Sequence, residues 1–329
     1  MRDVVIRVFV VWAVLAQLAE AGDLQQPTLI EVGPGRFCKW SPDGKYLSFA
    51  NAKGLQLYVV DSGTVRTIAP PTEIDGLNEA TYQWSSPDEL LFTRNRKVKA
   101  EKGSYSQWDY LSIRSDGKVD VIYSESMNWG SQVRTRPRRL NTGGVVLARE
   151  SVDSPEPLKK HRERAGLRSD AYYVVDGAFT GYLGVEINRG LWLLHPDGSK
   201  YKSISCEWDC RLPLLSPNGQ YVMCRIGRVI IDTSGVVVGL FDHGIDFEDW
   251  FADSKRVLYT KPLQSEFDVI GNEIFMSELN ATKEVQITST PDKTEMDPVI
   301  SPDMRRIAYR NYAADGHFIE ILDFGEVIK

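Results

Sequence analysis

The chain has 329 residues, of which 42% are hydrophobic, 26% charged and 10% aromatic. This is the composition of a globular protein with ample material for a core. The formal net charge of -6 argues against nucleic acid as a partner, because proteins that bind it usually present a basic face.

The first 21 residues predict an export signal. Arg2 and Arg7 precede the apolar run VFVVWAVLAQLA, and the tripeptide AEA at 19–21 forms a small-x-small cleavage pattern. The run is short for a bilayer-spanning helix, and an uncleaved anchor or a buried helix is the alternative. We expect a mature chain that starts near Gly22, lacks a transmembrane segment and functions in a bacterial periplasm or outside the cell.

A short motif recurs along the chain and predicts its fold. It reads KWSPDGKYLSFAN at 39–51, and relatives begin at positions 84 (WSSPDELLFTRN), 215 (LSPNGQYVMCR), 250 (WFADSKRVLYTK) and 300 (ISPDMRRIAYRN). In the first copy Pro42 fixes φ in a turn, Asp43 bonds nearby amides and Gly44 tolerates a positive φ. Each copy therefore predicts a β-hairpin, although Ser254 and Met304 replace the glycine in two of them.

A second hairpin with a polar turn follows each of the first hairpins. The six second hairpins read LQLYVVDSGTVRTIA, DYLSIRSDGKVDVIY, LWLLHPDGSKYKSIS, RVIIDTSGVVVGLF, IFMSELNATKEVQIT and FIEILDFGEVIK. A four-stranded meander cannot bury both faces alone, whereas radially stacked meanders bury each other. We expect an all-β fold, a six-bladed β-propeller of four-stranded antiparallel blades, formed as one domain by residues 22–329. A pair of β-sandwiches is the alternative.

WSPDGKYLSFAN and its relatives resemble the WD-like Pro-Asp-Gly repeat of the TolB-like β-propeller family, which also occurs in the propellers of prolyl-oligopeptidase-type peptidases. The resemblance covers nearly all of the mature chain. It implies a propeller fold and, as in TolB, the binding of a partner protein. Both relatives would add an α/β domain, whereas strand patterns here start soon after the signal and continue to the end. We therefore expect a propeller alone.

The third unit is irregular. Its first hairpin, VRTRPRRL with GGVVLARE, is separated from its second by a segment that we interpret as an insertion at about 151–188. The alternative is a seventh blade formed by residues 171–206. Five basic residues make the insertion either a solvated loop or a docking loop for an acidic partner; they are Lys159, Lys160, Arg162, Arg164 and Arg168.

The last unit has three strands and only GEVIK after them, while TLIEVG precedes the first hairpin. We therefore expect Thr28 to Val32 to supply the fourth strand of the last blade.

In a propeller the loops that enter each first strand gather around the channel mouth. Acidic groups predominate in these loops of blades four to six, which favours a basic peptide segment or a cation there, although loop ends are also polar because they meet water. We expect a monomeric binding or scaffold protein that recognises a segment of another envelope or secreted protein at this mouth. The candidate binding residues are Arg36, Glu79, Tyr82, Arg136, Asp209, Arg211, Asp246, Glu248 and Asp297.

The sequence contains no Gly-x-Ser-x-Gly elbow, no HExxH and no phosphate-binding glycine loop. We assign no catalytic residue, no cofactor and no metal. The alternative function is a secreted hydrolase or lyase that uses carboxylates and His243 at the mouth. A Cys206–Cys210 disulfide is possible, whereas Cys38 and Cys224 lie in predicted strands and are expected to be free core residues.

Overall fold

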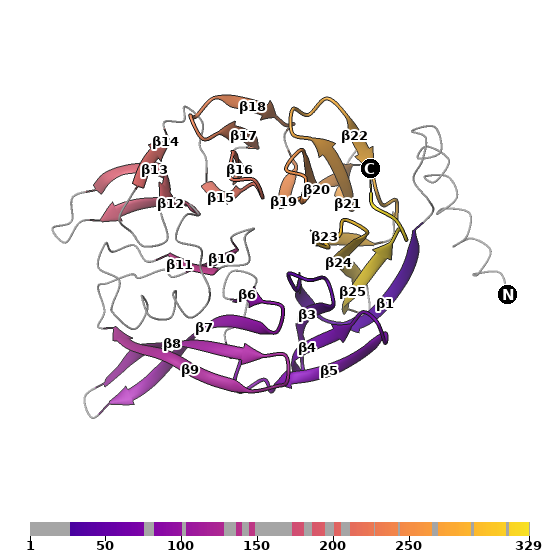
Figure 1. Ribbon diagram of the computed structural model, residues 1–329. Coiled ribbons are helices and arrows are strands. Elements are labelled where there is room, and N and C mark those ends of the chain that lie inside the picture. The colour runs from indigo at the N-terminus through magenta and orange to yellow at the C-terminus, as the bar shows by residue number, and fades with distance from the viewer. Residues whose placement is uncertain are drawn as a thin grey trace. The chain divides into compact units, whose positions relative to one another are not determined.

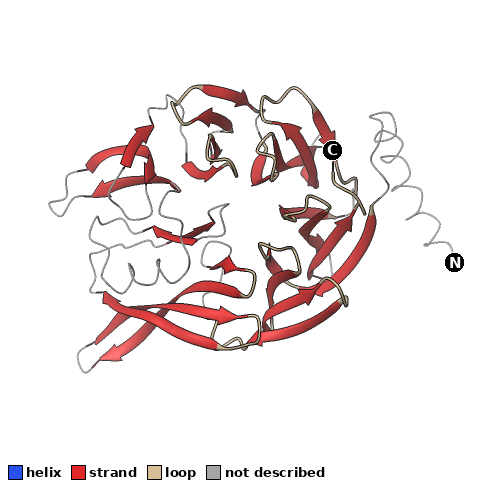
Figure 2. Ribbon diagram, viewed as in Figure 1, coloured by secondary structure: helices blue, strands red, loops and turns tan. Residues whose placement is uncertain are grey.

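The computed structural model describes most of the chain between residues 27 and 328. The described ranges are 27–75, 82–100, 103–127, 136–139, 145–148, 173–180, 186–194, 201–204, 211–226, 228–242, 244–264, 269–290, 293–313 and 316–328. Strands joined by turns and loops fill these ranges, and no helix occurs in them (Figure 2). Within them, accordingly, no helix of the length and hydrophobicity of a membrane span is found. The expected export signal lies outside the described residues and stays a prediction.

Five four-stranded antiparallel sheets account for most of the strands (Figure 1). The first two sheets consist of β2 (Arg36–Trp40), β3 (Tyr46–Asn51), β4 (Gly54–Val59) and β5 (Thr64–Ala69), and of β6 (Tyr82–Ser86), β7 (Glu89–Ala100), β8 (Gly103–Arg114) and β9 (Val119–Met127). The next two consist of β15 (Arg211–Leu215), β16 (Tyr221–Ile226), β17 (Val229–Asp232) and β18 (Val237–Leu240), and of β19 (Asp246–Trp250), β20 (Arg256–Gln264), β21 (Val269–Glu278) and β22 (Glu284–Gln286). The fifth joins β23 (Thr294–Ile300), β24 (Arg306–Ala313) and β25 (Gly316–Asp323) to β1 (Thr28–Pro34).

The expectation of six blades, or seven, is wrong. Strands β10 (Arg136–Arg139) and β11 (Val145–Ala148) pair only with each other, and β12 (Tyr173–Thr180), β13 (Glu186–Leu194) and β14 (Tyr201–Ile204) form a separate three-stranded sheet. The two hairpins of the third unit therefore do not combine into one blade. The physical reason is that β13 takes the preceding segment as its first partner, through the pairing of Tyr173 with Leu194, instead of the hairpin at 136–148. Five four-stranded blades remain.

The chain divides into two compact units. The first contains residues 1–40, 208–232 and 236–329, and the second contains residues 41–207 and 233–235.

A buried serine organises the recurring turns. In the first copy the Ser41 hydroxyl donates to Asp43 Oδ1 at 2.7 Å and accepts from the Tyr46 amide at 2.9 Å. Gly44 has a φ of 72°, and the Lys45 amide donates to the same Asp43 oxygen, as the turn chemistry predicts. The hydroxyls of Ser216 and Ser301 make the same two contacts in their own turns. Sequence reasoning emphasised proline and acid and overlooked this serine.

Replacing Ser41 with alanine should lower the free energy of unfolding by about 1–2 kcal/mol, because a buried amide and a carboxylate each lose a partner. Urea unfolding of Ser41→Ala measures the change. Ser62→Ala is the matched control, since the Ser62 hydroxyl contacts only Thr64 at an exposed turn. Equal stability of the two variants would contradict this role of Ser41.

The N-terminal strand completes the last blade, which confirms the expectation for Thr28 to Val32. β1 pairs antiparallel with β25 in a register that runs from Thr28 opposite Asp323 to Pro34 opposite Phe318. Segments almost three hundred residues apart thus lie side by side (Figure 1). The short segment after β25 forms no strand among the described residues; instead Ile328 is buried and its amide bonds to Met304 O.

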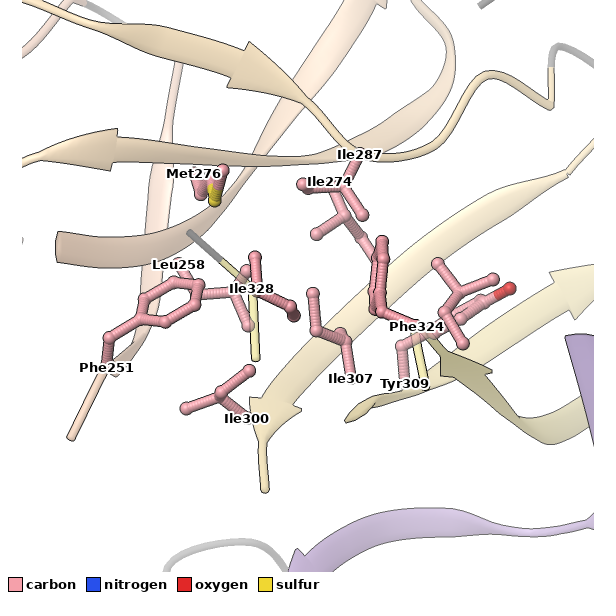
Figure 3. Close-up of a cluster of buried hydrophobic side chains, with 11 residues drawn as sticks. Phe251, Leu258, Ile274, Met276, Ile287, Ile300, Ile307, Tyr309, Phe324 and Ile328 are labelled. Atoms are coloured by element: carbon pink, nitrogen blue, oxygen red, sulfur yellow. The ribbon is translucent and has the colours of Figure 1, made fainter. Parts of the chain in front are cut away.

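A large apolar cluster fills the space between the last two blades. Figure 3 shows side chains of the last blade meeting those of the β19–β22 blade. The cluster consists of Phe251, Leu258, Ile274, Met276, Ile287, Ile300, Ile307, Tyr309, Leu322, Phe324 and Ile328. Burying such side chains stabilises the fold by roughly 1.5–3 kcal/mol each, so this contact holds the ends of the neighbouring strands at fixed positions.

Candidate functional site

The structure describes only part of the predicted channel mouth. Glu79, Asp209 and His243 lie outside the described residues, and the side chains of Arg136 and Arg211 are not described although both belong to strands. Their assignment stays a prediction.

Tyr82 was expected to be one of the binding residues, and this is wrong. Its side chain is 0% exposed and belongs to the core of the second sheet, where it lies opposite Phe92. It therefore cannot contact a partner. The physical reason is that β6 is an inner strand whose alternate side chains, including Trp84, point between the sheets.

Two of the predicted acidic residues are engaged with arginines of the first unit. Glu248 Oε2 accepts from Arg225 Nη2, and Asp297 Oδ2 lies 2.7 Å from Arg310 Nη2. Asp246 is exposed at the start of β19. The local negative charge is therefore lower than the sequence suggests.

Near Asp297, five side chains from four strands meet, and we call them the Arg36–His317 cluster: Arg36, Asp297, Arg310, Tyr312 and His317. They come from the start of β2, the middle of β23, the second half of β24 and the start of β25. Because β24 and β25 pair in antiparallel register, Tyr312 lies opposite His317, and their ring centroids are 4.8 Å apart. Arg310 and Tyr312 are two residues apart and so point to the same face of the sheet.

The backbone is strained at two positions of the cluster region. Phe37 has a φ of 60° and Asp297 a φ of 52°, values in the left-handed region that non-glycine residues rarely adopt. The β23–β24 ladder also shifts register between Met296 and Val299. Such strain costs of order 1–3 kcal/mol per residue and tends to occur where a site needs an unusual backbone. Here it directs the side chain of Asp297 to Arg310.

The surroundings of His317 hold its pKa below the ordinary value of 6.5. Burial is the largest cause of the lowered pKa of His317, and the positive charges of Arg310 and Arg36 lower this pKa further. The negative charge of Asp297 acts in the opposite direction. His317 Nδ1 and Arg310 Nε are both shielded from solvent and make no hydrogen bond within the described part of the chain. Tyr312 is 51% exposed.

Sequence reasoning missed Arg310, Tyr312 and His317. The predicted site consisted of the loops that enter each first strand, whereas these three residues flank the turn between the second and third strands of the last blade. That turn lies at the end of the blade where β23 begins, because β23 runs away from this end and β24 returns to it. The antiparallel meander itself would have been the signal.

A second polar network lies nearby, buried between the last two blades. The Thr290 hydroxyl donates to Glu295 Oε1, and the Thr290 amide donates to Glu273 Oε1. Glu320 accepts from Lys293, Asn311 and Tyr309 at 2.7–3.0 Å. Burial, followed by the negative charge of Glu273, raises the pKa of Glu295 to about 8. Within the described ranges no group of three acidic, histidine or cysteine residues is arranged to hold a metal ion.

The cysteines differ from expectation in their pairing. Cys38 is free and buried, as predicted. Cys224 was expected to be free but is disulfide-bonded. Cys206 and Cys210 lie outside the described residues. Since Cys38 is free, only these two remain as partners for Cys224, which is incompatible with the predicted Cys206–Cys210 bridge.

The described part of the chain is thus all-β, with four-stranded antiparallel blades of the β-propeller type. No family model and no curated protein matches the chain. Among solved structures it is similar to an oligogalacturonate lyase from Vibrio parahaemolyticus, with a TM-score of 0.40 and 12% identity over 87% of this chain and 76% of the other. An oligogalacturonate lyase in complex with manganese gives 0.40 and 11% over the same shares. A putative TolB from Agrobacterium tumefaciens gives 0.31 and 12% over 94% of this chain and 88% of the other. TM-scores this low carry no conclusion about the function of this chain.

Proposed function

We propose that this protein is an exported binding module that recognises a segment of a partner protein at the Arg36–His317 cluster. The observation that carries the proposal is the exposed Tyr312 ring, which lies against His317 at the end of the last blade where β23 begins. Tyrosine is enriched at the centre of protein interfaces because it combines a large apolar ring with a hydrogen-bonding hydroxyl.

The surrounding geometry supports the same function. The Arg36–His317 cluster lies on paired strands. The Trp40 indole of β2 donates a hydrogen bond to Val299 O of β23 at 3.1 Å, and the apolar side chains of Figure 3 pack the last blade against its neighbour. A rigid platform of this kind lowers the entropy lost on binding. The hydrolase or lyase alternative depends on His243, which lies outside the described residues, and no observation favours it.

Site-specific photocrosslinking tests the proposal. We expect p-benzoylphenylalanine at position 312 to give a discrete adduct with one protein in the source cells. Tyr312→Ala, made without the crosslinking residue, should leave the fold intact. Leu240 is the matched control position, because it is 52% exposed on β18 of the same unit but lies away from the cluster. Adducts at neither position, or equal adducts at both, would refute the proposal. The cellular fraction that contains the adduct also tests export.

A further inference from the structure

The Arg36–His317 cluster has more positive than negative charge. It contains the guanidinium groups of Arg36 and Arg310, and the one carboxylate in it, that of Asp297, is paired with Arg310. Arg36 is exposed, and no carboxylate of the described ranges forms an ion pair with it. One guanidinium is therefore available to an incoming anion, on the end of the blade where Tyr312 is exposed.

Two shielded nitrogen atoms in the cluster also need a hydrogen-bond partner. Arg310 Nη2 contacts Asp297 Oδ2 and Met296 Sδ, whereas Arg310 Nε has no hydrogen-bond partner among the described residues. His317 Nδ1 has none either. Buried polar groups in native proteins are nearly always satisfied, so this pair is completed either by ordered water or by a ligand group that replaces it.

We propose that the cluster binds a carboxylate of the partner polypeptide, an aspartate or glutamate side chain, between Arg36, Arg310 and His317. This inference rests on the proposed function and specifies its chemistry. A planar carboxylate matches the fork of an arginine. The Tyr312 ring, on the same face, would cover the methylene groups of the acidic residue or an apolar neighbour in the bound segment. The sequence favoured a basic segment; the pairing of Glu248 and Asp297 with arginines favours the opposite charge.

The same geometry predicts the pH dependence of binding. The charged groups that act on His317 are Arg310 on β24, Arg36 on β2 and Asp297 on β23. The other neighbours are the Tyr312 ring and Gly35, whose amide donates to His317 O. A bound carboxylate offsets the two arginines and favours the imidazolium. The affinity should therefore increase as the pH falls toward the lowered pKa of His317, below the ordinary histidine value of 6.5.

An array of end-blocked heptapeptides tests the inference. Each peptide that contains aspartate or glutamate is placed beside a copy with the corresponding amide, and Kd is then measured for the best pair. We expect the acidic peptide to bind about tenfold or more tightly than its amide copy, and Arg36→Gln to remove a similar factor. Arg305→Gln, the same change at the exposed residue that precedes β24, should leave Kd within about twofold. His317→Gln should abolish the pH dependence.

The outcomes separate this inference from the proposed function. If peptides bind and Tyr312→Ala weakens them, but the amide copies bind equally well, the protein is a binding module and the carboxylate inference is wrong. If no peptide binds at about 1 mM and position 312 gives no adduct, both fail. Two further probes are glutarate and a glycine peptide with a free C-terminal carboxylate. Binding of either as tight as that of the acidic peptide would assign the site to a small acid or to a chain end and overturn the inference for an acidic side chain.

Discussion

Removal of strand β1 is expected to lower the free energy of unfolding by on the order of 5 kcal/mol. The strand contributes six paired positions to the last blade, and each cross-strand pair contributes roughly 0.2–1 kcal/mol. Its loss also exposes the edge of β25, where Ile319 and Ile321 are now fully buried. At the usual unfolding entropy per residue, the melting temperature should fall by roughly 8 °C.

The experiment compares a chain that begins at Gln26 with one that begins at Gly35, by calorimetry and by urea unfolding. The first keeps all of β1 and controls for removal of the preceding residues. If the two chains melt at the same temperature, β1 does not complete the blade in solution. The shorter chain should also be more prone to aggregate, because an open strand edge pairs readily with another chain.

Replacement of Glu295 with glutamine is expected to stabilise the protein at alkaline pH and to have little effect in acid. Burial and the charge of Glu273 raise the pKa of Glu295 from 4.5 to about 8, so its folded form is protonated at neutral pH. A pKa raised by folding gives stability that is fully present below pH 4.5 and is lost as the pH rises through about 8. The difference between these two pKa values sets an upper limit of about 5 kcal/mol for the loss.

Melting temperatures recorded from about pH 5 to 9 measure this effect. The curve of the natural protein should fall toward pH 9, and that of Glu295→Gln should be flatter and lie above it at the alkaline end. Glu278→Gln is the control, since Glu278 is an exposed residue of β21 in the same unit. A natural protein with no alkaline loss of stability, or an equal gain from Glu278→Gln, would contradict the assignment.

The local structure of this protein follows closely from its sequence. Five copies of the turn motif predict five first hairpins, and all five occur, with Gly44 in the positive-φ conformation that its position requires. Ser254 and Met304 replace that glycine and still adopt φ values of 60° and 56°. Tertiary contacts therefore impose the turn at these two positions: Ser254 accepts a hydrogen bond from the Asn218 amide, and Met304 packs against the apolar cluster.

The candidate site was less predictable than the fold. Arg36 and Asp297 were found because they precede copies of the recurring motif. Arg310 lies within the copy at 300–311 but outside the loops that enter each first strand, and Tyr312 and His317 lie beyond that copy. The exposure of Tyr312 and the burial of Tyr82 also could not be read from residue type, because both are aromatic residues of alternating strands. Which of two such rings reaches solvent depends on what packs against that face of its sheet.

The sequence by itself determined the strands, their turns and the return of the N-terminal strand to the last blade, because backbone geometry and alternating hydrophobicity act over a few residues. Only the tertiary structure decided how many hairpins combine into four-stranded blades and which charges neutralise each other. Sheet pairing and ion pairing join residues far apart in the chain, and alternative partners differ by small energies that the local sequence does not record. The pairing of β13 with β12 changed the predicted fold, and the pairing of Arg310 with Asp297 changed the predicted site.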